Sequence, residues 1–192
     1  DIWLQNKLEE QLKFIKTNNY EFVYCNYIYM SDNGEKFGKE IKAGNMLNYK
    51  KALKDIRILT ITAMIDLKKI PKELCYMPNT MDEDIATWWK ILRNGYVAHG
   101  QDKVLAFYRK TKNSRSSKKY VTAYYRWKLY RQNENLSLLR SINCFIQYVI
   151  NALKKRANKI KFTKEEMQNK IEKRHLIEKN KIQVAISTQN LT

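Results

Sequence analysis

Hydrophobic positions recur at helical spacing in three stretches of the chain, and each spacing predicts an amphipathic helix. The first helix covers residues 3–17, with Asp1 placed to cap it, and its stripe is Leu4, Leu8, Leu12 and Ile15. The second covers 82–94 and ends at Asn94-Gly95, and its stripe is Ile85, Trp88, Trp89 and Leu92. The third covers 136–156, and its stripe is Leu139, Ile142, Phe145, Ile146, Val149, Ile150 and Leu153. Further helices are expected at 47–54, 119–132 and 163–182, and a frayed end from Val184.

Runs of β-branched and aromatic residues predict strands between these helices. The longest run, 22–30, has no polar alternation, so it is expected to be buried on both faces, and turn-forming residues follow at 31–35. Shorter strands are predicted at 59–65, 96–99 and 104–108. Strands that alternate with helices indicate an α/β architecture.

The positive charge is concentrated in the second half of the chain. Residues 1–100 hold 15 Lys and Arg against 13 Asp and Glu, whereas residues 101–192 hold 22 against 6. Such asymmetry favours a polyanionic partner, either nucleic acid or an anionic membrane, although a solvated basic face is an equal alternative. The apolar stripe of 136–156, followed by Lys154-Lys155-Arg156, fits the interface of an anionic membrane, and packing against a core or a partner is the other interpretation.

The small numbers of cysteines and histidines limit the disulfide and metal chemistry expected of the chain. The chain has three cysteines and two histidines, so we expect reduced thiols in a cytoplasmic protein and no histidine-based metal site. No stretch approaches the roughly 18 apolar residues that a membrane span needs, and no signal peptide is recognised. Because the sequence does not open on Met, we expect it to begin inside a longer protein.

Three consecutive carboxylates, Asp82, Glu83 and Asp84, stand in the first turn of the second helix. Acidic side chains are favourable there because the unpaired N–H groups leave that end positive. Capping is one interpretation, either by a Thr80–Glu83 capping box or by Asp82. The other is that one carboxylate faces a cleft as a general base, and the local pattern does not decide between the two. The serine-rich basic run at 109–119 is likewise either a lid or a linker.

Five segments in order resemble family 2 glycosyltransferases, which have the GT-A fold, and in particular those of bacterial cell-envelope polysaccharide synthesis. The segments are 1–11, 22–27, 62–65, 83–95 and 105–117. The resemblance implies that residues 1–120 are the acceptor-side part of a GT-A domain without its nucleotide-binding strands. It does not cover residues 121–192, which are expected to form a basic, mostly helical extension. Missing strands would leave an open edge or an exposed apolar face.

The resemblance also implies an inverting transfer of a sugar from a nucleotide-diphospho-sugar to a hydroxyl acceptor, and the expected acceptor is a lipid-linked glycan. Asp84 would be the base and Glu83 would orient it or cap the helix. Arg109 or the basic loop at 110–119 would help to hold the diphosphate. Trp88 or Trp89 would stack on a sugar ring, unless both are core residues. Mg²⁺ or Mn²⁺ is the expected cofactor, and Asp1 stands at the edge of an incomplete Asp-x-Asp metal motif.

The expected location is cytoplasmic and peripheral, at the inner face of the plasma membrane, with residues 136–156 on the anionic surface. The alternatives are a basic nucleic-acid-binding module or a membrane-surface interaction module without catalysis. Nucleic acid is the less favoured partner because no base-reading motif is recognised. A third alternative is a protein with the transferase fold and no activity.

Overall fold

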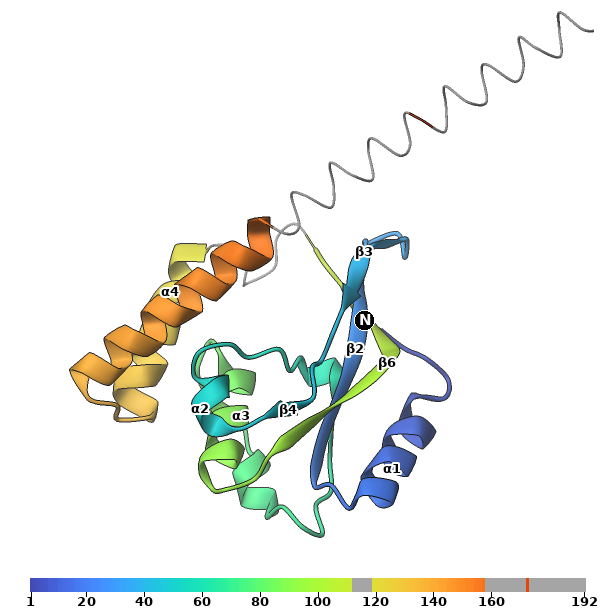
Figure 1. Ribbon diagram of the computed structural model, residues 1–192, viewed down its shortest axis with the longest axis horizontal. Coiled ribbons are helices and arrows are strands. Elements are labelled where there is room, and N and C mark those ends of the chain that lie inside the picture. Colours follow the sequence, from blue (N-terminus) through green and yellow to red (C-terminus); the bar gives the residue numbers. More distant parts are fainter. Residues whose placement is uncertain (112–118, 158–171, 173–192) are drawn as a thin grey trace, which may run out of the picture. The chain divides into compact units, whose positions relative to one another are not determined.

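The computed structural model describes residues 1–111, 119–157 and 172, and Figure 1 shows their arrangement. It divides the chain into two compact units, 1–151 and 152–192, of which the first holds the fold described below. The elements in order are β1 (Ile2–Trp3), α1 (Lys7–Asn18), β2 (Phe22–Met30), β3 (Lys36–Ile41), β4 (Met46–Leu47), α2 (Tyr49–Ala52), η1 (Thr60–Thr62), β5 (Ala63–Ile65), η2 (Lys72–Cys75), α3 (Glu83–Arg93), β6 (Ala98–Arg109), α4 (Lys119–Lys128) and η4 (Leu129–Asn133). Residues 138–151 are also helical, and helical backbone continues to residue 157. The predicted helix at 163–182 and the end from Val184 lie outside the described residues, apart from residue 172.

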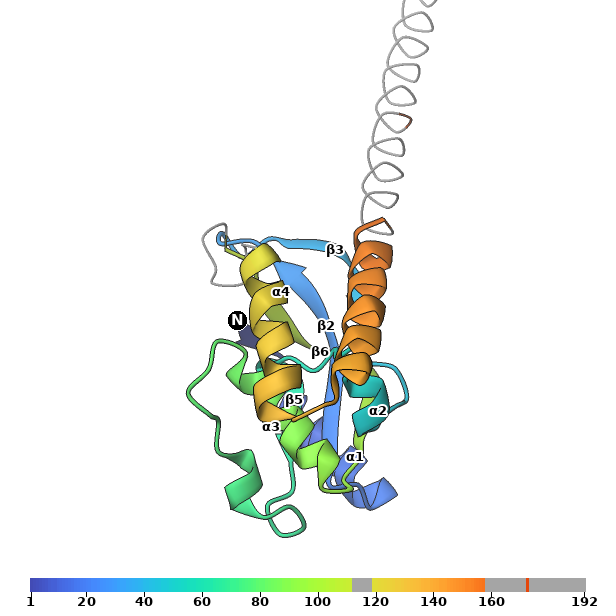
Figure 2. The ribbon, with the colours of Figure 1, turned by 90° about the vertical axis from the view of Figure 1, so that its left-hand side faces the viewer.

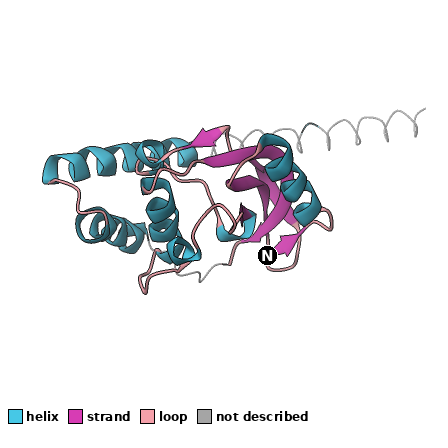
Figure 3. Cartoon of the chain, turned by 90° about the horizontal axis from the view of Figure 1, so that it is seen from below, coloured by secondary structure: helices cyan, strands magenta, loops and turns pink. Residues whose placement is uncertain are grey.

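A six-stranded mixed sheet is the centre of this unit, which confirms the α/β class. The strand order is β1-β6-β2-β3, while β4 pairs with β6 and β5 pairs with β2. The neighbouring strands β2 and β6 are parallel, and the other pairs are antiparallel. In Figures 1 and 3, α1 lies on one side of the sheet and the remaining helices lie on the other.

The run at 22–30 forms β2 with the predicted bounds, and it is buried along most of its length. The predicted strand at 59–65 is instead a 3₁₀ turn, closed by a 2.8 Å bond from Thr62 Oγ1 to the Leu59 carbonyl, followed by the three residues of β5. The two strands predicted at 96–99 and 104–108 are a single strand, β6, whose register shifts opposite Cys25 and Asn26. Strand β3 was not predicted, because its charged side chains are exposed.

A glycine is required at position 100 of β6 because the backbone of residue 44 passes close to it. A Cβ at this position would lie 1.7 Å from the carbonyl oxygen of Gly44, and the Gly100 N–H already donates to the Asn45 carbonyl at 2.9 Å. Any larger residue would push the 43–45 segment away from the strand.

Helix α1 differs from the prediction in both its start and its buried face. It begins at Lys7 because Ile2 and Trp3 pair with β6 as strand β1, so Asp1 does not cap it. Leu8 and Leu12 of the predicted stripe are about half exposed, and the buried residues are Lys7, Gln11 and Ile15.

The buried polar groups of α1 explain this orientation. The Gln11 amide donates to the Thr62 carbonyl at 2.9 Å, and Lys7 Nζ donates to Gln11 Oε1 at 2.6 Å and lies 4.3 Å from the centroid of the Trp3 ring. These bonds satisfy polar atoms that would otherwise be costly to bury. Burial lowers the pKa of Lys7.

The main core lies on the other side of the sheet, around α3. The Trp89 ring stacks on Tyr130 with 5.1 Å between centroids, and the Trp89 indole N–H donates to the Ala52 carbonyl at 3.1 Å. Tyr130 donates its hydroxyl proton to the Leu53 carbonyl at 2.5 Å. Leu129, Tyr130 and Cys144 all belong to this core. The compact unit therefore continues to residue 151, and the predicted domain boundary at residue 120 falls inside it.

The cysteine prediction agrees with the structure, in which all three thiols are free. Burial raises the pKa of Cys25 to about 11. No helix in the described part of the chain has both the length and the apolar character needed to cross a bilayer.

Candidate active site

The acidic end of α3 does not use the predicted capping box. Glu83 is the first helical residue, so it is too close to the helix start to act as the third residue of a box with Thr80 at the cap. The cap position belongs to Asp82, which makes no side-chain capping bond. The capping interpretation therefore does not account for these side chains.

Asp82 is instead paired with Arg126 of α4. Its Oδ2 lies 3.6 Å from Arg126 Nε, an ion pair somewhat longer than a hydrogen bond. Burial is the main cause that raises the pKa of Asp82, and the Arg126 charge opposes that effect. The pair joins the start of α3 to a helix some 40 residues further along the chain.

Arg126 is nearly buried, with 4% of its surface exposed, and it lies between aromatic rings. Its guanidinium carbon is 5.3 Å from the centroid of the Trp89 ring and 4.9 Å from that of Tyr148. These contacts allow a cation to be buried beside one partly exposed carboxylate. The sequence interpretation missed Arg126 because it assigned the basic residues after 120 to a separate extension.

Asp84, the candidate base, is partly buried in the first turn of α3. One of its oxygens accepts the backbone N–H of Ile85 at 2.8 Å. Burial raises the pKa of Asp84; the Ile85 N–H lowers it, the charges of Asp82 and Glu83 raise it further, and Arg126 lowers it. A carboxylate with a raised pKa is a stronger proton acceptor near neutral pH than an ordinary aspartate.

Asp84 interacts electrostatically with the end of strand β6. The pKa of Tyr108 is raised mainly by burial, then by the neighbouring Tyr29 and by the charge of Asp84. Tyr108 and Arg109 pair with Tyr29 and Met30, so the carboxyl ends of the parallel strands β2 and β6 lie side by side here. In open α/β sheets this edge is where ligands bind.

Two more of the predicted residues meet at the same edge. Asp1 Oδ1 accepts the backbone N–H of Arg109 at 2.7 Å. The Arg109 guanidinium donates to the carbonyls of Ser31, at 3.4 Å, and Asp32, so it is held against the β2–β3 turn. The structure thus brings Asp1 and Arg109 together directly, and the charge of Asp84 acts on Tyr108, the residue that precedes Arg109.

The residues present do not form a cation site by themselves. Within residues 1–111, 119–157 and 172, no group of three or more His, Cys, Asp and Glu side chains is placed to hold a metal ion. Asp1 supplies one carboxylate, and one of its oxygens already accepts a backbone bond. Mg²⁺ and Mn²⁺ need several oxygen ligands, so we derive no step through a metal from this chain.

Trp88 and Trp89 are both core residues, as one of the two sequence interpretations had it. Trp88 is 4% exposed and contacts Phe22 at 5.2 Å between ring centroids, and Trp89 is fully buried. Sugar stacking by Trp88 has no exposed ring face to support it in this arrangement. Glu83 is partly buried beside Asp84, and its carbonyl accepts the Thr87 hydroxyl at 2.8 Å.

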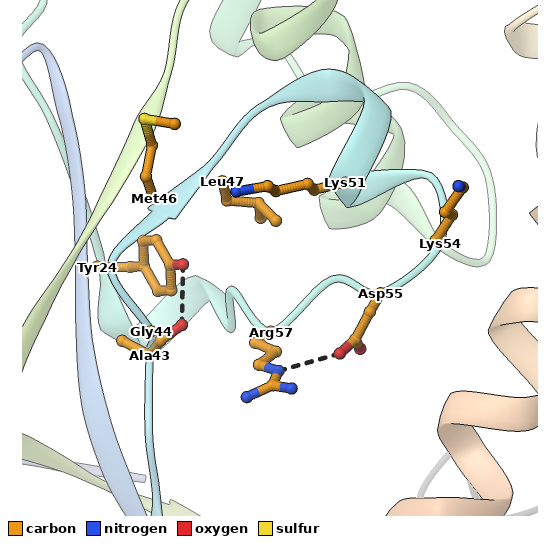
Figure 4. Close-up of a pocket in the computed structure, with 9 residues that line it drawn as sticks. All are labelled: Tyr24, Ala43, Gly44, Met46, Leu47, Lys51, Lys54, Asp55 and Arg57. Atoms are coloured by element: carbon orange, nitrogen blue, oxygen red, sulfur yellow. Dashed lines mark hydrogen bonds and ion pairs between the residues drawn. The ribbon is translucent and has the colours of Figure 1, made fainter.

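A hollow of about 380 Å³ lies beside β4 and α2, and Figure 4 shows it. Its lining residues are Tyr24, Ala43, Gly44, Met46, Leu47, Lys51, Lys54, Asp55 and Arg57. Arg57 Nε donates to Asp55 at 3.0 Å, and the Tyr24 hydroxyl donates to the Ala43 carbonyl at 2.9 Å. With three cations and one acid, this hollow suits an anionic group, and Asp84 is not among its lining residues.

Comparison with known proteins adds independent information. No profile of a known protein family matches the chain. The chain is 38% identical over 157 residues to a Bacillus subtilis (strain 168) protein named provisionally as the teichuronic acid biosynthesis glycosyltransferase TuaG, covering 81% of this chain and 62% of that protein. It is 30% identical over 158 residues to the Escherichia coli UDP-Glc:alpha-D-GlcNAc-diphosphoundecaprenol beta-1,3-glucosyltransferase WfgD, covering 82% and 60%. It is also 26% identical over 153 residues to an uncharacterized glycosyltransferase of Haemophilus influenzae, covering 79% and 60%.

These relatives agree in kind, since each is named a glycosyltransferase. The chain spans about three fifths of their length. The similarity covers about four fifths of the chain and therefore includes the sheet edge with Asp84, Tyr108 and Arg109. It supports the interpretation of this chain as glycosyltransferase sequence.

Proposed function

We propose that the whole protein is an inverting family 2 glycosyltransferase with the GT-A fold. It transfers a hexosyl group from a nucleotide-diphospho-sugar to a hydroxyl of a lipid-linked glycan during cell-envelope polysaccharide synthesis. The names of the relatives support the reaction class, and WfgD is named for a diphosphoundecaprenol-linked substrate. The observation that carries the proposal is the partly buried Asp84, whose pKa is raised and whose charge acts on Tyr108 near the carboxyl end of β6.

The chemistry requires a proton acceptor at this place. A sugar hydroxyl is a poor nucleophile at neutral pH, so a positioned base must take its proton as the attack proceeds. The hydroxyl oxygen forms the new bond to the anomeric carbon while its proton moves to the second carboxylate oxygen of Asp84. The bond from the anomeric carbon to the diphosphate breaks, and the nucleotide diphosphate leaves with that electron pair.

The neighbouring residues would have supporting roles. Glu83 is adjacent in the first turn of α3, where it raises the pKa of Asp84 and helps to keep it basic. Arg109 would assist the leaving diphosphate after exchanging one of its carbonyl contacts in the β2–β3 turn. A divalent cation, Mg²⁺ or Mn²⁺, is part of the proposal for the whole protein, and Asp1 would be at most one of its ligands.

The test is turnover of the whole protein with nucleotide-sugar and a glycan acceptor, comparing wild type, Asp84→Asn and Asp84→Glu. Loss of a general base lowers kcat by about 10²–10⁴-fold, so we expect Asp84→Asn to fall in that range with little change in KM. The wild-type rate should fall as the pH is lowered through the raised pKa of Asp84.

Glu35→Gln is the matched control, because it removes an exposed acid from the β2–β3 turn. It should keep full turnover. Unchanged turnover in folded Asp84→Asn would remove Asp84 as the base and with it the mechanism proposed here.

A further inference from the structure

The apolar stripe of the 138–151 helix faces away from the core. Successive helical residues are turned by about 100°, so the stripe and the core-facing side occupy different parts of the helix surface. The core side consists of Ser141 and Cys144, with Phe145 and Tyr148 partly buried. The exposed side consists of Leu138 (55%), Leu139 (82%), Ile142 (40%), Ile146 (51%), Val149 (36%) and Ile150 (38%). Core packing, one of the two interpretations of this stripe, is therefore wrong for these side chains.

Contacts on the opposite side fix this orientation. Trp127 of α4 packs edge-on against Phe145, with 5.7 Å between ring centroids, and Arg126 lies over Tyr148. The Asn151 amide donates to the Lys54 carbonyl at 3.3 Å. Figure 2 shows α4 and this helix side by side. The helix cannot roll its stripe inward without breaking these contacts, so the stripe is left for a partner.

Positive charge borders the stripe. A hollow of about 420 Å³ is lined by Lys50, Leu53, Lys54, Leu139, Arg140, Asn143 and Cys144, which places three cations beside the most exposed leucine of the stripe. Between residues 119 and 151 the sequence has five Lys and Arg and a single acid, Glu134. That acid has a side chain only 2% exposed, and it accepts bonds from Arg93, at 3.1 Å, and Tyr49.

We propose that this face lies in the interface of an anionic lipid bilayer. The stripe enters the boundary between headgroups and acyl chains, and Lys50, Lys54 and Arg140 contact lipid phosphates. An amphipathic helix with a wide apolar side and flanking cations binds membranes in this way, by burying apolar area and by attraction to anionic headgroups. A protein partner or a second copy would not require an acid-free border. The proposal extends the proposed function. It rests on that function in one respect, namely that the enzyme meets its lipid-linked acceptor at this surface.

The test is sedimentation of the full chain with vesicles of phosphatidylglycerol mixed with phosphatidylcholine, and with vesicles of phosphatidylcholine alone. We expect binding to the anionic vesicles that weakens as salt is added, because headgroup attraction is screened. Ile142→Glu with Ile146→Glu places two charges on the stripe and should weaken binding by at least about tenfold. Lys54→Gln with Arg140→Gln should reduce the preference for anionic vesicles.

The control is Leu67→Glu, which charges a leucine that is 57% exposed in the loop after β5 and should bind as wild type. Unchanged vesicle binding by the Ile142 and Ile146 double variant would overturn the proposal. So would equal wild-type binding to neutral vesicles, or a dimer that the double variant dissociates while no vesicle binding is seen.

Two readouts separate this proposal from the proposed function. Asp84→Asn should keep vesicle binding while losing transfer. The stripe variant should keep transfer to a soluble acceptor while losing vesicle binding. If Asp84→Asn keeps transfer, Asp84 is not the base. If the stripe variant keeps vesicle binding, the stripe is not the membrane face.

Discussion

Helix α3 and the 138–151 helix have similar patterns in sequence and opposite positions in the molecule. Both carry an apolar stripe at helical spacing. In α3 the stripe is inside, with Trp88, Trp89 and Leu92 almost fully buried and Ile85 partly buried. In the 138–151 helix the stripe is outside, and the core contacts are made by Ser141 and Cys144. Helical periodicity thus predicts that a helix has an apolar face, but it does not say what covers that face.

The difference has a physical basis in what each helix meets. Helix α3 packs against the sheet and against α2. Its Trp88 ring contacts Phe22, and its Trp89 ring stacks on Tyr130. The 138–151 helix contacts the core through the small residues Ser141 and Cys144, and it is held by the edge-on contact of Phe145 with Trp127 and by the contact of Tyr148 with Arg126. The predictions that follow test this contrast, from the largest expected effect to the smallest.

Trp89→Ala should be the most damaging change. It removes a fully buried ring, its stacking on Tyr130 and its bond to the Ala52 carbonyl. Such truncations lower the free energy of unfolding by about 3–5 kcal/mol. Urea unfolding followed by circular dichroism measures this. A loss below about 1 kcal/mol would mean that α3 does not anchor the core.

Arg126→Ala should come next. The substitution leaves Asp82 without its ion pair in a partly buried place and removes the cation between Trp89 and Tyr148. Breaking a buried pair from one side costs about 3 kcal/mol, somewhat less where one partner is partly exposed, as Asp82 is. The control is Lys128→Ala on the same helix, at a half-buried position. Equal stability of the two variants would contradict the role of Arg126 as the link between α3 and α4.

Asp84→Asn should raise stability at neutral pH while it removes activity. The pKa of Asp84 is raised in the folded protein, so the folded state binds the proton more tightly than the unfolded state does. Stability contributed by this group is therefore lost as pH rises from the ordinary aspartate pKa, about 3.9, through the raised value. In urea unfolding measured from about pH 4 upward through the raised pKa, the free energy of unfolding of the variant should rise relative to that of wild type. A constant difference across this range would show that burial does not penalise the Asp84 charge.

Ile146→Ala should have the smallest effect on folding. The side chain is half exposed on the outward stripe, so truncating it should change the free energy of unfolding by less than about 0.5 kcal/mol. The same urea unfolding measurement allows a direct comparison of this variant with Trp89→Ala. A loss comparable to that of Trp89→Ala would show that the stripe is covered in the folded chain.

Part of the candidate site could be predicted from local sequence. The three carboxylates before an apolar-periodic run mark the start of a helix, and α3 begins at Glu83, one residue after the predicted start. Strand β2 was predictable for a similar reason, because a long β-branched and aromatic run is stable in a sheet covered on both faces. Arg126 and Tyr108 were not predictable, because their roles depend on contacts with residues 20 or more positions away.

Helix α1 also shows what a local pattern does not predict, in this case a buried polar face. Its leucine stripe predicted the buried face, but Lys7 and Gln11 are buried and Leu8 is exposed. The carbonyl of Thr62, from a turn 51 residues after Gln11, accepts the Gln11 amide and makes that burial possible. A polar side chain is buried only where a partner is available, and the sequence pattern of one helix contains no information about that partner.

By itself the sequence determined the α/β class, the central strand, the helix that carries the acids and the uneven distribution of charge, because these depend on residues close together in the chain. The tertiary structure decided which apolar faces are covered, where Asp82 finds its cation, and that Asp1 and Arg109 meet at one end of the sheet. The physical reason is that burial and ion pairing are properties of two surfaces in contact. The apolar or charged character of each surface follows from its own segment. Which two surfaces are in contact is decided only when distant segments fold together.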